Sequence, residues 1–182
     1  HISDESFAQF KYWEPTKQIE VDKLKYDDIT KKVNKLLLQS VEKRLIADVP
    51  VGVFLSGGID SSTLVAAASK VAENKINTFS ITFDDKIYDE GIYARQIADL
   101  YATNHKEIKV DPNFLLHNMD KYIKQMDHPT ADGLNSYVIS KAVSDENIKV
   151  AISGAGSDEL FLGYPFYKLA GKFEENQWVQ SF

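Results

Sequence analysis

Apolar residues recur at spacings of three and four through the first long pattern of the chain: Ile29, Val33, Leu36, Leu37, Val41 and Leu45. This period predicts an amphipathic helix from Tyr26 to Ala47. Asp27 and Asp28 place negative charge in its first turn, where the helix dipole favours it. Pro50 accounts for the break that follows. The preceding segment, 1–25, has no clean period, and we expect an irregular or extended lead-in.

After Pro50 the pattern alternates between short apolar runs and longer helical stretches. The apolar runs predict four strands: Val51–Leu55, Asn77–Phe83, His105–Val110 and Lys149–Ile152. The helical stretches between and after them are expected at about Ser61–Glu73, Glu90–Tyr101, Pro112–Lys124, Asn135–Ser144 and from near Asp158. Strands that alternate with helices predict right-handed βαβ units. The expected fold is therefore α/β and doubly wound, with a mostly parallel sheet and helices on both faces.

The composition limits the class of protein but does not identify a function. The 182 residues suffice for one domain, which we place at 26–182 after the lead-in. The chain begins without Met and stops soon after its last motif, so we expect a fragment of a longer protein, truncated at the C-terminus. A net charge of −6 argues against a broad nucleic-acid surface.

Two further features of the composition exclude particular chemistries. The chain has no cysteine, which excludes disulfides, thiolate metal sites and a cysteine nucleophile, and fits a cytoplasmic location. No apolar run approaches the roughly 18 residues that span a membrane. We therefore expect small-molecule ligands and neither nucleic acid nor membrane as a partner.

The most informative stretch joins the first predicted strand to the helix after it. The strand ends in Ser56-Gly57-Gly58, and Ile59-Asp60-Ser61-Ser62 follows. Glycines allow a tight turn, and the free N–H groups of the next helix favour an anion such as phosphate. Asp60 would repel phosphates unless Mg²⁺ lies between them, because Mg²⁺ takes carboxylate and phosphate oxygens together. The alternative is a glycine-requiring turn in which Asp60 only begins a helix.

A second turn has the same character. The strand ending at Ile152 runs into Ser153-Gly154-Ala155-Gly156-Ser157-Asp158-Glu159. In a strand order of 3-2-1-4, strands one and four are neighbours, and their carboxyl ends meet at the point where ligands bind doubly wound sheets. Asp60 and Asp158 could then hold one metal from two sides. The alternative for this turn is a plain loop with Asp158 and Glu159 in the first turn of a helix.

Together the two turns resemble the ATP-pyrophosphatase (PP-loop) domain of the glutamine-hydrolysing asparagine synthetase family. The first turn is similar to the S-G-G-x-D-S signature of many PP-loop enzymes. The second resembles the more specific S-G-x-G-x-D-E-x-F-x-G-Y, which here runs from Ser153 to Tyr164. Two further blocks resemble the family: Tyr88-Asp89-Glu90 with Ala94-Arg95, and Asp127-x-Pro129-x-x-Asp132. The resemblance covers roughly Tyr26 to Tyr167.

The resemblance implies an adenine nucleotide alpha hydrolase-like fold and a role for each motif position. Mg²⁺ would be bound by Asp60 and Asp158. The pyrophosphate of ATP would be held by Ser56, Gly57, Gly58, Ser61 and Ser62. The adenosine would contact Leu55, Ile81, Ser153 and Gly154. The implied function is the core of an amide-forming ligase that adenylates a carboxylate, aspartate or a related acid, and releases pyrophosphate. No catalytic side chain is assigned.

Three departures from the family pattern leave a second function open. No N-terminal glutaminase is present, so the ammonia would have to come from a glutaminase domain elsewhere or from a separate source. The chain alone is therefore expected to be inactive. Ala155 stands where asparagine synthetases carry Glu, and Leu162 replaces a usual Gly. The alternative is a non-catalytic nucleotide-binding or interaction module that retains the fold. PP-loop enzymes acting on tRNA or a base are disfavoured by the acidic charge and by the Asp158-Glu159-Leu160-Phe161 string.

Overall fold

The computed structural model describes residues 2–3, 6–7, 9–12, 25–82, 91–110, 112–128, 130 and 133–167. It divides into two compact units, His1–Leu36 and Leu37–Phe182, and the division falls within helix α1 (Tyr26–Leu45). The predicted boundary after residue 25 remains a prediction. Among the described residues, no helix is both long and apolar enough to cross a bilayer.

The first unit contains a short hairpin and the first turns of α1. Strand β1 (Ile2–Ser3) pairs antiparallel with β2 (Ser6–Phe7). The described part of the lead-in thus contains paired strands, whereas the sequence predicted only an irregular or extended segment; residues 13–24 lie outside the described residues. Helix α1 carries acids in its first turn and ends on Lys43 and Arg44, so both ends complement the helix dipole.

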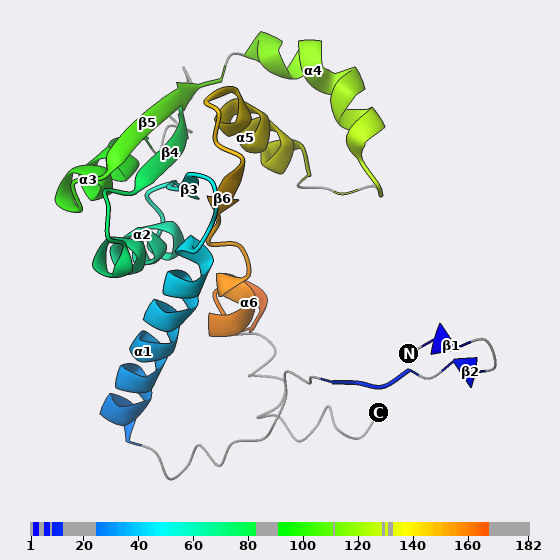
Figure 1. The fold of residues 1–182 in the computed structure, drawn as a ribbon. Coiled ribbons are helices and arrows are strands. Elements are labelled where there is room, and N and C mark those ends of the chain that lie inside the picture. The colour runs from blue at the N-terminus through cyan, green and yellow to red at the C-terminus, as the bar shows by residue number, and fades with distance from the viewer. Residues whose placement is uncertain are drawn as a thin grey trace. The chain divides into compact units, whose positions relative to one another are not determined.

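The second unit is organised by a parallel sheet of four strands (Figure 1). Its strands are β3 (Val51–Phe54), β4 (Asn77–Thr82), β5 (Asn104–Lys109) and β6 (Val150–Ile152). Their order is β5-β4-β3-β6, which confirms the predicted order 3-2-1-4. In this register Val53 lies between Thr78 of β4 and Ile152 of β6. The carboxyl ends of β3 and β6 are therefore neighbours.

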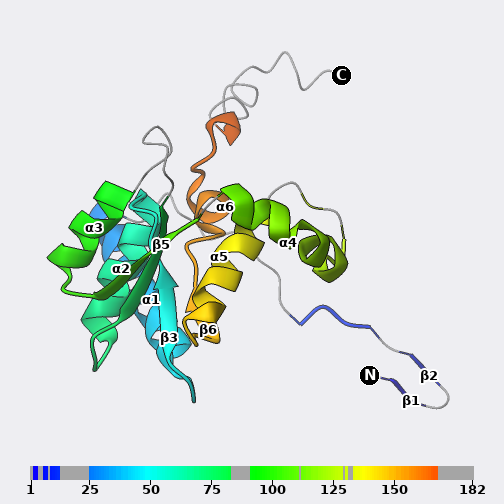
Figure 2. The same cartoon turned by 90° about the horizontal axis from the view of Figure 1, so that it is seen from above.

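Helices cover both faces of this sheet, as predicted. The helices that follow β3 along the chain are α2 (Ile59–Val71), α3 (Gly91–Leu100), α4 (Pro112–Gln125), α5 (Gly133–Asp145) and α6 (Ser157–Phe161). Seen from above, α2 and α3 lie on one face and α5 on the other (Figure 2). This is the arrangement that right-handed crossovers produce when the chain moves first from β3 to β5 and then back across to β6.

The main hydrophobic core fills the space between the sheet and the α2–α3 face. Val53, Leu55 and Val65 are at most 1% exposed. Helices α2 and α3 contribute mainly alanines to it: Ala67, Ala68, Ala94 and Ala98. Small side chains let the two helices approach the sheet closely, and the second half of α1 adds the buried Val41. Burial of this set supplies the main favourable free energy of folding for the unit.

Element boundaries differ from the predictions by one or two residues. Helix α2 begins at Ile59 rather than near Ser61, because Gly58 is extended (φ −69°, ψ 166°) and acts as the N-cap. It ends two residues before the predicted Glu73, since Ala72 is again extended. Consequently Ile59 and Asp60 belong to the first helical turn and not to the loop. Phe83, at the predicted end of β4, lies outside the described residues.

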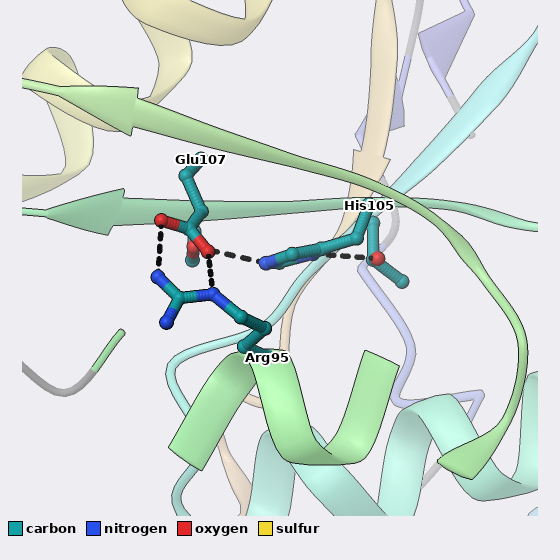
Figure 3. A network of polar contacts seen from close by, with 5 residues as sticks. Arg95, His105 and Glu107 are labelled. Atoms are coloured by element: carbon teal, nitrogen blue, oxygen red, sulfur yellow. Dashed lines mark hydrogen bonds and ion pairs between the residues drawn. The ribbon is translucent and has the colours of Figure 1, made fainter. Parts of the chain in front are cut away.

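A buried polar cluster connects β4, β5 and α3 on this same face. The Nδ1 atom of His105 lies 2.9 Å from Thr78 Oγ1, which also lies 2.8 Å from Thr103 Oγ1. The Nε2 atom of His105 lies 3.3 Å from Ser80 Oγ. Figure 3 shows Arg95, on α3, pointing to Glu107, and this bidentate pair has two 2.7 Å hydrogen bonds. The hydroxyls satisfy the half-buried imidazole.

We expect this cluster to make stability depend on pH. Burial lowers the pKa of His105 below 6.5; Glu107 and Asp99 oppose this shift and Arg95 adds to it. Because the unfolded chain then binds protons more readily, stability is fully present above pH 6.5 and falls as the pH drops from there toward the folded-state pKa. The hydrogen bonds from Arg95 hold the pKa of Glu107 low, so its contribution is lost only at lower pH.

The measurement is the urea midpoint of the chain and of His105→Gln between pH 8 and about pH 5. Glutamine keeps two polar atoms near Thr78 but has no group that titrates in this range. The parent midpoint should fall toward low pH more steeply than that of the variant. Parallel curves would show that protonation of His105 does not control stability here.

Candidate functional site

The first predicted turn is held by hydroxyl groups at its two ends. The amide of Gly58 donates to Ser56 Oγ (3.3 Å), and Ser61 Oγ donates back to the carbonyl of Gly58 (3.2 Å). Ser61 Oγ also accepts the amide of Ser56 (3.2 Å) and lies 3.0 Å from Ser56 Oγ. These bonds tie the end of β3 to the first turn of α2, so the turn is closed before any ligand arrives.

Gly57 is the position in this turn that a side chain would not tolerate. Its φ is +85°, a left-handed conformation that favours glycine. A Cβ added there would lie 2.6 Å from Tyr93 Cβ and 2.7 Å from the amide nitrogen of Ala94. The start of α3 therefore packs directly on the turn. Ala94 belongs to the motif block that also contains Tyr88-Asp89-Glu90 and Arg95. Its contact with Gly57 explains why this part of the block lies beside the first turn. Tyr88-Asp89-Glu90 lie outside the described residues.

The second turn repeats the bonding of the first. The amide of Ala155 donates to Ser153 Oγ (3.1 Å), and Ser157 Oγ donates to the carbonyl of Gly154 (2.7 Å). In both turns the serine that ends a strand accepts the amide two residues on, and a serine in the next helix donates to the glycine carbonyl three residues before it. Gly156 has a φ of +94° and completes the turn into α6.

The two turns are in contact with each other at Gly154. A Cβ at this position would lie 3.2 Å from Asp60 Cβ and 3.3 Å from the amide nitrogen of Ser61. A side chain here would be in tight contact with the start of α2, so glycine favours this close approach of the second turn. The parallel pairing of β3 with β6 thus brings the two motifs together, as the sequence predicted.

A cavity of about 830 Å³ opens at this junction. It is lined by Phe54, Leu55, Ser56, Asp60, Ser61, Ile81, Asn135, Ser136, Ile139, Ser140, Ser153, Gly154, Ala155 and Asp158. This volume lies in the range of small-molecule and cofactor sites, and its mixture of apolar and polar side chains is typical of them. Apolar residues come from the ends of β3 and β4, and polar groups come from the two turns.

The structure therefore brings together most of the predicted site residues. Leu55, Ser56, Asp60, Ser61, Ile81, Ser153, Gly154 and Asp158 all line the cavity. Gly57, Gly58 and Ser62 do not line it. Gly57 and Gly58 shape the turn behind the lining residues. The Oγ atom of Ser62 is buried and has no hydrogen-bond partner among the described residues, so the predicted phosphate contact would first require this hydroxyl to become accessible.

Sequence reasoning missed the contribution of α5. Asn135, Ser136, Ile139 and Ser140 all line the cavity. Ile139 and Ser140 follow Ser136 by three and four positions, and Asn135 adjoins Ser136, so the four residues lie on one face of the helix. A mostly polar face on a helix that covers a sheet is the signal that could have identified them. Of the nearby Asp-x-Pro block, Asp127 is exposed, while Pro129 and Asp132 lie outside the described residues.

The donor set is compatible with Mg²⁺ and phosphates together. Asp60 and Asp158 both line the cavity, and the described part of the chain has no group of three or more His, Cys, Asp or Glu residues that could hold a metal alone. Mg²⁺ is typically bound by one or two carboxylates and completed by substrate phosphates and waters. Two carboxylates beside a cavity of this size therefore fit a metal that arrives with its nucleotide.

The fold and the paired turns define a class of α/β protein with a ligand cavity at the carboxyl ends of its parallel strands. Among solved structures, the chain is similar in fold to a glutamine-dependent NAD⁺ synthetase of Acinetobacter baumannii in complex with adenosine diphosphate. The TM-score is 0.50 at 17% identity, over 72% of this chain and 27% of that one. This likeness supports the predicted adenine nucleotide alpha hydrolase-like fold.

Sequence comparison identifies the family. The family model described as asparagine synthase matches residues 32–181, so the chain belongs to that family. It is 34% identical to asparagine synthetase 1 of Bacillus subtilis over 78% of this chain and 22% of that protein. It is 31% identical to amidase chry2 of Gibberella zeae over 91% of this chain and 27% of that protein. The chain thus spans about a quarter of the length of these two relatives.

Gly57→Ala should destabilise the chain strongly. The methyl group meets the backbone of α3 and also demands a left-handed φ of an alanine. Overpacking of this kind costs about 1–3 kcal/mol, to which the backbone strain adds about 1 kcal/mol. Gly58→Ala is the matched control, because Gly58 has an ordinary φ of −69° and its Cβ would meet only Ser56 Oγ, at 3.3 Å.

The free energy of unfolding of both variants, measured by urea titration, checks this expectation. Gly57→Ala should lose several times more stability than Gly58→Ala. Equal losses would mean that the turn relaxes away from α3 and does not depend on the close approach.

Proposed function

We propose that this chain is the ATP-binding core of an amide-forming ligase that adenylates a carboxylate and releases pyrophosphate. The observation that carries the proposal is the convergence of two Ser-Gly turns, each followed by a carboxylate, on one cavity. Membership of the asparagine synthase family supports it. Aspartate or a related acid is the acceptor that we propose, in a cytoplasmic enzyme.

The cavity offers a separate place for each part of ATP. Leu55, Phe54 and Ile81 supply the apolar surface that an adenine ring needs, at the ends of β3 and β4. Ser56 and the first turn of α2 supply donors for the polyphosphate, and the α2 dipole favours its charge. Asp60 and Asp158 would hold Mg²⁺. When bound, this ion would offset the charge of the polyphosphate as pyrophosphate leaves.

The reaction depends mainly on the positioning of its substrates. A carboxylate oxygen attacks the α-phosphorus of ATP, the bond from that phosphorus to the bridging oxygen breaks, and pyrophosphate departs with the electron pair. Residues of this chain orient the nucleotide and stabilise the leaving group, which requires little covalent work by side chains. An amine then attacks the acyl carbon and AMP leaves. The ammonia for this step would come from a glutaminase domain or a separate source.

A non-catalytic nucleotide-binding module is the second candidate. The observation that favours it is Ala155, which lines the cavity with a methyl group where the resembled family pattern carries a titratable Glu. Both carboxylates of the proposed metal site remain, however, and either candidate could use them to bind Mg²⁺–ATP. Adenylation therefore distinguishes the two candidates better than amide formation does.

Calorimetric titration with ATP should show binding that weakens when Mg²⁺ is chelated. Asp60→Asn and Asp158→Asn should each remove most of the metal-dependent part, because amides are neutral and weaker metal ligands. Asp48→Asn is the matched control, since Asp48 is an exposed carboxylate before β3, at the other end of the strand. If both cavity variants bind Mg²⁺–ATP as the parent does, the shared-metal arrangement is wrong.

The proposed enzymatic function predicts that residue 155 affects adenylation and amide formation to different extents. In the complete gene product, pyrophosphate release with a carboxylate substrate should proceed although Ala155 has no proton to exchange. Amide formation should gain more from Ala155→Glu than adenylation does, because general acid–base help is worth about 10²–10⁴-fold. Pyrophosphate and amide are measured separately with aspartate, ATP and ammonia. Asparagine formation that matches adenylation in the parent, and that Glu does not improve, would contradict this expectation.

A further inference from the structure

The segment after α6 folds back onto Asp158. The carbonyl oxygen of Asp158 accepts the amide of Leu162 and also the amide of Gly163, the latter at 3.0 Å. Leu162 is left-handed, with φ 58° and ψ 41°. This is the pattern of a Schellman C-cap, in which a left-handed residue turns the chain back over the last helical turn. We call Leu162–Tyr164 the return segment.

Gly163 lies directly against the carboxylate of Asp158. A Cβ added at Gly163 would lie 1.8 Å from Asp158 Oδ1 and 2.8 Å from Asp158 Cγ. The glycines with positive φ among the described residues are Gly57 and Gly156, so Gly163 has a backbone conformation that other residues adopt. Glycine is therefore required here for the space that the carboxylate occupies and not for backbone freedom.

Tyr164 fastens the return segment to the neighbouring residue. Its hydroxyl donates to Glu159 Oε1 at 2.9 Å, and this hydrogen bond raises the pKa of Tyr164. Helix α6 has only five residues and cannot be stable in isolation. The cap at Leu162 and the Tyr164–Glu159 bond therefore hold α6 in place, while Gly163 lies against the side chain of Asp158.

We propose that Gly163 is a positioning residue that sets the direction of the Asp158 carboxylate in the cavity. The inference rests on the proposed function, in which Asp158 holds Mg²⁺ with the nucleotide. A methyl group at Gly163 would displace the far end of a short side chain, which yields more easily than backbone does. The substitution should therefore turn the carboxylate away from its position and leave the fold in place.

The experiment is a double-mutant cycle on the 182-residue chain with Gly163→Ala, Asp158→Ala and the double variant. Thermal unfolding reports the contact, because Asp158→Ala removes the atoms that the new methyl would meet. Gly163→Ala should lower the unfolding midpoint in the parent and lower it less, or not at all, beside Asp158→Ala. Contacting residues give such non-additive effects, and independent sites add.

The same variants are titrated with ATP, with and without Mg²⁺. Gly163→Ala should reduce the metal-dependent affinity by about tenfold, the lower end of the range for residues that orient a metal ligand. It should leave the metal-independent affinity unchanged, and it should cause no further loss beside Asp158→Ala. Tyr164→Phe is the matched control: it removes the hydrogen bond to Glu159 and leaves Gly163 in place, and it should keep the metal dependence of the parent.

The outcomes separate this inference from the proposed function. Additive effects on the unfolding midpoint, or an unchanged metal dependence in Gly163→Ala, would overturn the positioning role while the proposed function stands. A Gly163→Ala chain that does not fold, and is not rescued by Asp158→Ala, would also overturn it. A parent without any metal-dependent ATP binding would overturn both the shared-metal site and the role of Gly163 toward it. A non-additive unfolding midpoint would then support only a structural contact between Gly163 and Asp158.

Discussion

The close approach of the two turns at Gly154 is the constraint on which the candidate site depends. Parallel pairing of β3 and β6 makes the strand ends neighbours, but it does not by itself bring the turns into contact. Gly154 presents no side chain to Asp60 or to the amide of Ser61, and a Cβ there would be in tight contact with them, at 3.2 and 3.3 Å. A larger residue would press against the start of α2, beside the cavity that Asp60 and Asp158 line.

A second close approach supports the first turn from behind. Gly57 packs on the start of α3, so the turn lies between α3 on one side and the second turn on the other. The hydroxyl of Ser61 closes the turn internally. A site fixed from several directions before the ligand binds loses little order on binding, which is what a reaction that depends on positioning requires.

Much of this arrangement could be predicted from the sequence, for physical reasons that can be named. Short runs between the helical stretches located the strands within a residue or two, and the Ser-Gly turns located the ends that carry the site. Helix α2 was predicted to begin two residues late, because Asp60 suits both a turn and a first helical turn. The polar stripe of α5 was a signal that sequence reasoning missed, and the period of a helix alone does not say which face meets a cavity.

Contacts between segments distant in sequence were beyond prediction as well. Nothing near Gly57 in the sequence indicates that α3 lies against it, and the hydroxyl partners of His105, Thr78 and Ser80, both come from β4. In the sequence, Gly163 could be recognised only as one position of the family motif. Its function in the fold depends on the rotamer of a residue five positions earlier, which local propensity does not determine.

The two substitutions relative to the family pattern, Ala155 and Leu162, differ in their effect on the structure. At Ala155 the turn uses only the backbone amide, which donates to Ser153 Oγ, so a change of side chain alters the chemistry of the cavity without altering the turn. At Leu162 the chain adopts a left-handed conformation that costs a non-glycine residue about 1 kcal/mol. That conformation persists because both amides of Leu162 and Gly163 bind the carbonyl of Asp158. The segment therefore keeps the geometry around Asp158 although Leu162 makes that geometry less favourable than glycine would, whereas Ala155 alters the lining of the cavity and leaves the turn unchanged.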